Sequence, residues 1–334
     1  MAGVLPSAPS APFQMPPPTR RGSVRRRTVL YAELSGTPSA IGSVEASVDP
    51  SPYPTLSPPP GFKPPEPKRF AIRPDKLLDI FSAALALPFR LGTGAFALGY
   101  SVSLVSEDKI PSDQYAMGIA GLKLKETSKL GPRPEKPIEI YEFESCPFCR
   151  KVREILSILS LDVLYYPCPR NGPNFRPKVL QMGGKQQFPY MVDPNTGVSM
   201  YESNDIIKYL VDKYGDGTIP FMLSLGLLTT LTEGFAMIGR MGKGSFYTPS
   251  KLPPLPLELW AYEPSPYCKL VREVLVELEL PHILHSTPRG SPTRQELYEK
   301  VGIFQVPYLE DHNTGVKMFE SAEIIEYLRA VYAT

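Results

Sequence analysis

Two cysteines separated by two residues are the strongest chemical signal in this sequence. Cys146 and Cys149 frame the motif Cys-Pro-Phe-Cys, and the apolar spacing after them predicts a helix that begins just after Cys146. A thiol at a helix N-terminus faces unpaired backbone N–H groups and the positive end of the dipole, which favour the thiolate and lower the thiol pKa. Pro147 suits the first helical position, where its missing N–H has no partner to lose. The motif therefore predicts Cys146 as a nucleophile and Cys149 as the resolving thiol.

A metal site is the alternative reading of the same pair. A structural zinc site needs four ligands, and the sequence has no second C-x-x-C motif. A shared iron–sulfur cluster would need two chains and glutathione as ligands. We expect redox chemistry and no metal. We expect Cys168 to be an ordinary buried thiol, and we expect no ligand set from the three histidines (His282, His285 and His312).

The chain repeats itself at a distance of 118 or 119 residues. The segment Ile138–Tyr141 before the cysteine motif matches Leu257–Trp260, and Ser265-Pro266-Tyr267-Cys268 matches the motif itself. Later matches keep the register: Phe188-Pro189-Tyr190 with Val306-Pro307-Tyr308, Asn195-Thr196-Gly197 with Asn313-Thr314-Gly315, and Glu202-Ser203 with Glu320-Ser321. So constant an offset indicates one fold built twice.

Each repeat predicts the same order of elements. In the first, Ile138–Glu144 is a buried strand, the apolar face from Val152 to Leu159 is a helix, and Leu161–Tyr166 is a second strand. A strand–helix–strand order implies a right-handed parallel crossover. A short hairpin follows around Pro194–Gly197, and Ser203 suits the N-cap of a last helix. The repeats are thus predicted α/β units of β-α-β then β-β-α.

This element order with a Cys-Pro-Phe-Cys turn resembles glutaredoxins, the N-terminal domain of glutathione transferases and the glutaredoxin-like membrane-associated prostaglandin E synthase. It is most similar to plant and algal plastid proteins with tandem transferase N-terminal domains. The resemblance covers residues 136–215 and 255–334 and implies two tandem thioredoxin-like folds. It also implies a cis bond before Pro189 and Pro307, with the backbone of Phe188 and Val306 offered to the cysteinyl part of glutathione.

The resemblance implies a binding role for the Glu-Ser pairs too. Glu202 would hold the γ-glutamyl ammonium of glutathione, and Ser203 with the free helix N–H groups would hold the carboxylate. Glu320 and Ser321 match in the second repeat. There Ser265 replaces Cys146 and only Cys268 remains, so dithiol exchange is not available. Some transferases activate glutathione with a serine at this turn, and Cys268 is left open between a packed and a reactive thiol.

The remaining segments predict a targeting peptide and apolar helices. Residues 1–32 are basic, hydroxylated and free of Asp and Glu, as in a transit peptide, and residues 1–68 as a whole are predicted to be that peptide plus a disordered Pro/Ser-rich linker. We expect a chloroplast address, with the mitochondrion as the alternative. Apolar segments at 70–135 and 216–254 precede the repeats, with a loose match of 94–99 to 234–239. They are expected to pack on the repeats, with membrane-surface contact or a span as alternatives.

Three functions fit these features. The first is a plastid glutathione-dependent thiol–disulfide oxidoreductase; the second is a tandem module that binds glutathione or a protein with little turnover; the third is a glutathione transferase or isomerase acting on an apolar small molecule. Partners are accordingly glutathione and a protein disulfide or an apolar molecule. A formal net charge of +2 and the lack of a basic patch with aromatics speak against nucleic acid.

Overall fold

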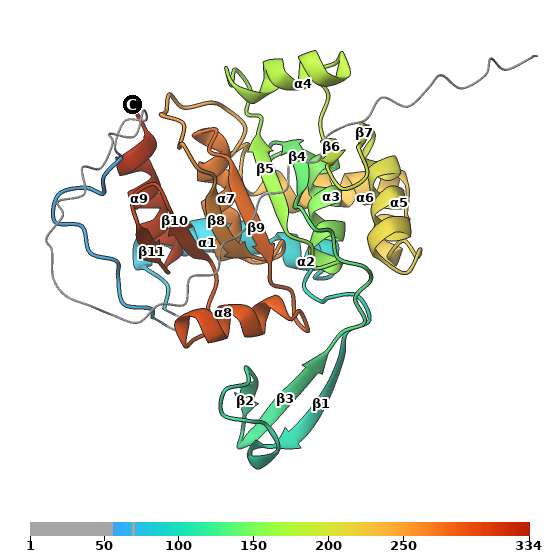
Figure 1. The fold of residues 1–334 in the computed structure, drawn as a ribbon, viewed down its shortest axis with the longest axis vertical. Coiled ribbons are helices and arrows are strands. Elements are labelled where there is room, and N and C mark those ends of the chain that lie inside the picture. The colour runs from blue at the N-terminus through green and yellow to red at the C-terminus, as the bar shows by residue number, and fades with distance from the viewer. Residues whose placement is uncertain (1–55, 69–70) are drawn as a thin grey trace, which may run out of the picture. The chain divides into compact units, whose positions relative to one another are not determined.

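The computed structural model describes residues 56–68 and 71–334, which lie in one compact unit, Ser51–Thr334. Within these residues the centre is one eight-stranded mixed sheet in the order β11-β10-β8-β9-β5-β4-β6-β7. Figure 1 shows this sheet running through both repeats. The predicted transit peptide lies outside the described residues, so that expectation stays a prediction.

Both repeats have the element order that the sequence predicts, with one more helix in each. The first is built from β4 (Ile138–Glu142), α3 (Pro147–Ile158), β5 (Val163–Pro167), α4 (Phe175–Gly183), β6 (Tyr190–Asp193), β7 (Val198–Met200) and α5 (Ser203–Tyr214). The second is built from β8 (Leu257–Ala261), α7 (Pro266–Glu277), β9 (His282–Ser286), α8 (Thr293–Val301), β10 (Tyr308–Asp311), β11 (Val316–Met318) and α9 (Ser321–Tyr332). In each, the first two strands are parallel and the hairpin is antiparallel.

The two repeats join edge to edge through β5 and β9, the same strand of each copy. These strands pair antiparallel, with Leu164 opposite Ile283, which is its own counterpart in the other repeat. Apolar side chains of both repeats form one continuous core. The pairing removes an exposed strand edge from each repeat, an edge that would otherwise be free to pair with other chains.

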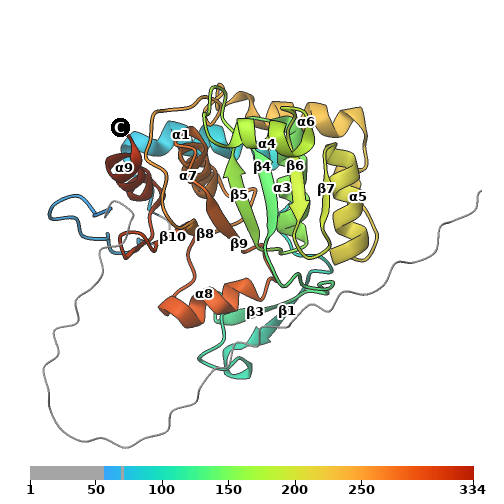
Figure 2. The same ribbon diagram turned by 45° about the horizontal axis from the view of Figure 1, so that its top comes forward.

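The apolar helices are exchanged between the repeats. The helix α1 (Leu77–Ala84), which precedes the first repeat, packs on α7 of the second, and α6 (Leu227–Ile238), which precedes the second repeat, packs on α3 of the first. Figure 2 shows α1 and α6 along the same side of the sheet. Between them, α2 (Ala86–Arg90) packs on α6.

These helices also extend the repeat, in a register different from the one expected. Arg90 ion-pairs with Glu154 of α3, and Arg240 ion-pairs with the matching Glu273 of α7. The match therefore runs from Arg90–Phe96 to Arg240–Phe246. The sequence match of 94–99 to 234–239 was wrong, because shared Gly and Phe residues outweighed the arginine that the tertiary structure uses.

One face of the helix layer is apolar and exposed. Leu78 is 83% exposed on α1, Leu227 is 84% exposed on α6, and Phe89 stacks on Phe235 between α2 and α6. The charged side chains point the other way: Glu233 and Arg90 are buried and pair at 3.0 Å. Among the described residues, no helix combines the length and apolar character needed to cross a membrane.

The segment 70–135 is less helical than its apolar character suggested. After α2 it forms a small sheet of β1 (Ser101–Ser106), β2 (Met117–Ile119) and β3 (Leu122–Thr127), in the order β1-β3-β2. Ala120 and Gly121, both with positive φ, make the tight turn between β2 and β3. Alternation of polar and apolar residues over 101–104 and 122–126 favours strands.

Residues 56–68 are ordered against the second repeat, which corrects the expected disordered linker over this part of it. Phe62 lies against Tyr327 with ring centroids 5.1 Å apart, and Leu56 packs on the core. The composition is poor in apolar residues, but these two side chains reach an existing core instead of having to build one.

Candidate functional site

The cysteine motif lies where the sequence placed it, at the start of α3. Cys146 is the N-cap, and its Sγ accepts a hydrogen bond from the backbone N–H of Cys149 at 3.3 Å. Both thiols are free; Cys146 is 5% exposed and Cys149 is 1% exposed. The leading thiol is therefore held at the helix N-terminus beside a second thiol on the same helix face.

The two thiols differ in acidity in the way a nucleophile and a resolving thiol should. The pKa of Cys146 is lowered, first by the hydrogen bond from the Cys149 side chain and then, against the effect of burial, by the backbone N–H of Cys149. Burial raises the pKa of Cys149 well above its usual value, and its bond to Cys146 raises it further. The thiolate is accordingly favoured at Cys146.

A buried carboxyl next to the motif was missed by the sequence analysis. Glu142, the last residue of β4, ion-pairs with Arg153, and burial raises its pKa to about 7. The negative charge of Glu142 also acts to raise the pKa of both cysteines. The matching residue in the second repeat is Ala261, and this difference between the repeats was the signal available in the sequence.

Strand pairing brings the predicted glutathione residues to the same end of the sheet. Tyr190 pairs with Tyr141, so the Phe188–Pro189 bond enters β6 beside the chain that leaves β4 toward Cys146. That bond is cis, and so is Val306–Pro307, as the resemblance implied. Phe188 also meets Phe143 edge to face, with ring centroids 6.1 Å apart.

The Glu-Ser pair adjoins the same helix. Ser203 is the first residue of α5, and Glu202 before it has a positive φ of 66° and accepts a hydrogen bond from Gln187 at 2.6 Å. Lys151 of α3 donates to Asn204 at 2.7 Å and ties the first turn of α5 to the helix that carries the cysteines. The fold thus gathers the predicted residues of the first repeat around the start of α3.

A shallow cavity of about 640 Å³ opens beside this turn. Phe143, Arg176 and Phe188 line it together with residues of the loop before α4. The guanidinium of Arg176 lies over both rings, 4.7 Å from Phe188 and 5.5 Å from Phe143. Sequence reasoning did not single out Arg176.

The second repeat keeps the geometry but is contacted by its own chain. Ser265 Oγ accepts the Cys268 N–H at 3.3 Å, and burial raises the pKa of the fully buried Cys268. Gln305 donates to Glu320, as Gln187 does to Glu202. Glu320 also accepts the backbone N–H of Lys68 at 2.6 Å. The backbone N–H of Lys68 therefore bonds to the same Oε1 of Glu320 that accepts from Gln305, in the carboxylate that the resemblance assigned to glutathione.

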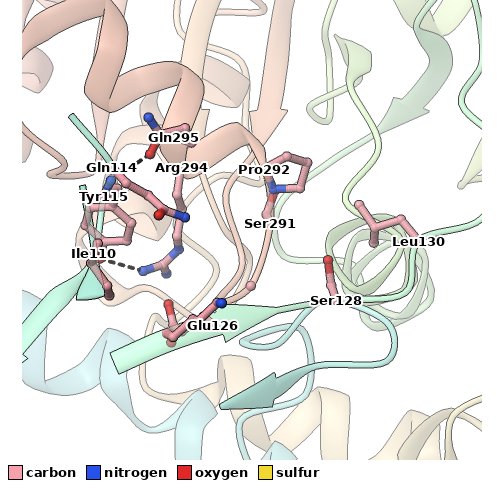
Figure 3. A pocket seen from close by; sticks show the side chains of 12 residues that line it. Ile110, Gln114, Tyr115, Glu126, Ser128, Leu130, Ser291, Pro292, Arg294 and Gln295 are labelled. Carbon is pink, nitrogen blue, oxygen red and sulfur yellow. Dashed lines mark hydrogen bonds between the residues drawn. The ribbon is translucent and has the colours of Figure 1, made fainter. Parts of the chain in front are cut away.

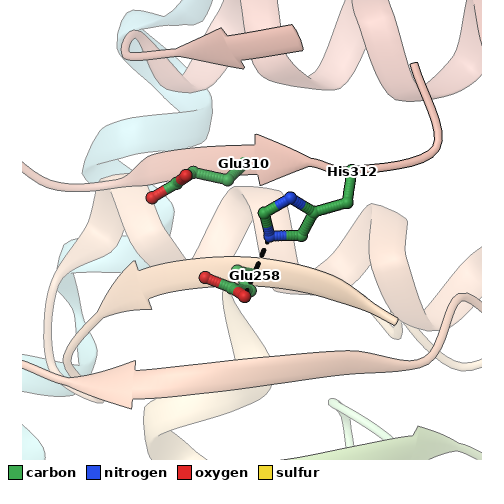
Figure 4. A group of neighbouring side chains, drawn as sticks. All are labelled: Glu258, Glu310 and His312. Atoms are coloured by element: carbon green, nitrogen blue, oxygen red, sulfur yellow. Dashed lines mark hydrogen bonds and ion pairs between the residues drawn. The ribbon is translucent and has the colours of Figure 1, made fainter. Parts of the chain in front are cut away.

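The other cysteine and the histidines have structural partners. Cys168 is fully buried and burial raises its pKa well above normal, so it is an inert packed thiol as expected. His312 and Glu258 hydrogen-bond at 2.9 Å next to Glu310 (Figure 4). Lys300 and Lys317 ion-pair with Glu310 and neutralise it, so this group is an ion-pair cluster on the second repeat.

A network of charges is buried where the two repeats meet, and it includes two matching arginines and two matching glutamates. Arg153 and Arg272 occupy matching positions, as do Glu144 and Glu263. Arg153 lies 3.1 Å from Glu263 and 3.5 Å from Glu144, while Arg272 lies 3.2 Å from Glu144 and 3.0 Å from Glu263. Each arginine thus bridges its own repeat and the other, through a glutamate two residues ahead of each motif.

Comparison with known proteins agrees with the duplicated architecture. Residues 140–218 and 259–334 both match the family model "Glutathione S-transferase, N-terminal domain". Two solved structures of a Bombyx mori glutathione transferase, BmGSTD1, one of them in complex with GTT, are 33% identical with TM-scores of 0.23. They match 25% of this chain, which spans 38% or 39% of theirs. No curated protein matches. Both repeats are therefore similar to the glutathione S-transferase N-terminal domain, in tandem.

Proposed function

We propose that this protein is a glutathione-dependent thiol–disulfide oxidoreductase that uses Cys146 and Cys149. The observation that carries the proposal is the Cys146 Sγ at the N-terminus of α3, which has a lowered pKa and accepts a hydrogen bond from the Cys149 N–H, with the second thiol on the same helix. The second repeat has Ser265 at this position and lacks the second sulfur. The reaction is therefore assigned to the first repeat.

The proposed reaction moves two electrons from glutathione to a disulfide. The Cys146 thiolate attacks one sulfur of the substrate, the S–S bond breaks, and the leaving thiolate takes a proton from solvent. Cys149 loses its proton and attacks Sγ of Cys146, which releases the second substrate thiol and leaves a Cys146–Cys149 disulfide. Two glutathione molecules then reduce that disulfide and leave as oxidised glutathione.

Glutathione would lie along the start of α3 and α5. The backbone of Phe188, ahead of the cis Pro189, would pair with its cysteinyl part. Ser203 and the N–H groups of α5 would hold its γ-glutamyl carboxylate, as the positive end of a helix favours an anion. Glu202 would bind the ammonium.

The test is steady-state reduction of a glutathione mixed disulfide by the full chain, with glutathione as reductant. Cys146→Ser should lose at least about a hundredfold in kcat/KM because the nucleophile is gone. Cys168→Ser is the matched control and should keep wild-type activity, because that thiol is buried and inert. A wild-type chain that binds glutathione without turnover would replace this proposal with a binding module. Activity that survives Cys146→Ser would favour a transferase or isomerase acting on an apolar molecule.

The place of action is part of the proposal. The composition of residues 1–32 supports a plastid address, with the mitochondrion as the alternative. We also propose that the exposed apolar face of α1, α2 and α6 contacts a lipid surface. Its large side chains point outward while Arg90, Glu233 and Arg240 turn inward, which is the distribution found where a helix faces lipid.

A further inference from the structure

The second repeat has an aromatic side chain lodged beside its motif turn. Tyr115 belongs to the loop before β2, in a segment that has no counterpart ahead of the second repeat. Arg294 donates to the Tyr115 hydroxyl at 3.2 Å, and the Tyr115 ring lies 4.8 Å from that of Phe304. Figure 3 shows Tyr115 between Ile110, Arg294 and Gln295.

The backbone of the same loop is held as well. Gln295 accepts the Tyr115 N–H at 2.6 Å and donates to the carbonyl of Asp113 at 2.9 Å. Tyr298 of α8 donates to the Ser112 carbonyl at 3.4 Å. The second repeat therefore binds a short peptide segment of its own chain, with Tyr115 as the anchor.

The arginine that holds Tyr115 has a twin in the first repeat. Arg294 Nε donates to the carbonyls of Thr287 and Pro288, just after β9. Arg176 Nε donates to the matching carbonyls of Cys168 and Pro169, just after β5. Two carbonyls fix each guanidinium in the same orientation, so Arg176 stands in the first repeat where Arg294 stands in the second.

In the first repeat the place of Tyr115 is open. Among the described residues, none accepts a hydrogen bond from the terminal nitrogens of Arg176, and the cavity of about 640 Å³ lies there. The aromatic residue that contacts the arginine stands at a different position in each repeat, two residues apart in the alignment. Phe304 lies under Arg294 in the second repeat, and Phe188 lies under Arg176 in the first, each within 4.7 Å. A ring and a cation are thus kept in both grooves.

We infer that this open groove binds an aromatic side chain, a tyrosine above all, of a protein substrate. The ring would pack against Phe188 and Phe143, and the hydroxyl would accept a hydrogen bond from a terminal nitrogen of Arg176, as Tyr115 does from Arg294. Phe143 also accepts the backbone N–H of Cys146 at 3.2 Å, so the groove adjoins the nucleophile. The inference rests on the proposed reaction and adds its substrate class, a protein disulfide with a nearby tyrosine.

The test uses peptide–glutathione mixed disulfides in which one tyrosine is stepped along an alanine background on either side of the cysteine. For the full chain, at least one tyrosine position should exceed the all-alanine peptide about tenfold in kcat/KM, through a lower KM. In Arg176→Met this ratio should fall to about one. Arg294→Met is the matched control and should keep it.

The outcomes separate this inference from the proposed function. Equal rates at every tyrosine position, or a preference that survives Arg176→Met, would overturn the inference and leave the oxidoreductase standing. A raised KM for glutathione in Arg176→Met with an unchanged tyrosine ratio would assign Arg176 to glutathione and overturn it too. If no peptide is reduced, binding of the corresponding cysteine-to-serine peptides is measured by calorimetry. Tyrosine-dependent binding that is lost in Arg176→Met supports the groove without the reaction. If binding does not depend on the tyrosine, the groove and the reaction are both rejected.

Discussion

Leu164 and Ile283 occupy matching positions in the two repeats and pair directly with each other across β5 and β9. A residue opposite its own counterpart marks a local two-fold axis, so the repeats relate as the subunits of a symmetric dimer do. Their flanking pairs obey it as well, since Val163 faces Leu284 and Tyr165 faces His282. The repeat in the sequence thus folds as an internal dimer, in which only the first repeat carries two motif thiols.

Removing one cation from the buried charges near this axis should destabilise the fold. Arg272→Met would leave Glu144 and Glu263 buried with one cation fewer, and breaking such a set costs about 3–5 kcal/mol. We expect a loss of that size in the free energy of unfolding, measured in urea. Arg329→Met is the control; its side chain is 46% exposed and pairs with Glu277, so it should cost at most about 1 kcal/mol. Equal losses would contradict the argument.

The Cys146 thiol should ionise more readily than a free cysteine. With Cys149 and the other thiols present, the pH midpoint of its alkylation should lie below the ordinary value of about 8.5. Cys149→Ala should raise that midpoint, because the hydrogen bond from Cys149 is the largest cause of the lowered pKa. Mass spectrometry of the alkylated peptide across pH measures it. A midpoint at or above that of free cysteine would remove the basis for a poised nucleophile.

His282 should make the fold sensitive to mild acid. It is buried at the join of the repeats beside Tyr165, and burial lowers its pKa to about 4. The pKa of His282 is near 6.5 in the unfolded chain, so between pH 6.5 and about pH 4 only the unfolded chain takes up the proton. The free energy of unfolding is therefore at its full value above pH 6.5 and decreases as the pH falls through this window.

The matching measurement compares the wild type with His282→Gln from pH 7 to pH 4. The wild type should lose about 3 kcal/mol more than the variant by pH 4. Glu142, whose pKa is raised to about 7, acts in the opposite direction in both proteins and cancels in the comparison. Parallel pH profiles would show that His282 is not held neutral.

The apolar face should bind lipid through its most exposed residues. Leu78→Glu combined with Leu227→Glu should abolish co-flotation of the full chain with vesicles, since both side chains are more than 80% exposed and contribute little to the core. Leu104→Glu, on β1 and 61% exposed, is the control and should still float. Wild-type protein that stays in the soluble fraction would contradict the lipid proposal.

The duplicated α/β unit, its element order and the Cys146–Cys149 motif could be predicted from the chain alone. Those features depend on local spacing: the constant offset of 118 or 119 residues, the helical apolar face after Cys149, and turn residues such as Asn195 and Gly197. The helical face and the turns are set by residues close together in the sequence, and the repeat is found by aligning the sequence with itself, so neither needs three-dimensional information.

The joining of the repeats, the exchange of α1 and α6, and the filling of the second groove were decided by the tertiary structure. Ser265 shows in the sequence that the second repeat lacks its leading thiol, but Tyr115 and Lys68 lie about 150 and 200 residues before it. Their contacts with Arg294 and Glu320 depend on how distant segments pack, and single side chains of this kind leave no periodic signal. Arg176 is a candidate binding residue because its counterpart in the second repeat, Arg294, holds Tyr115, and only the tertiary structure shows that contact.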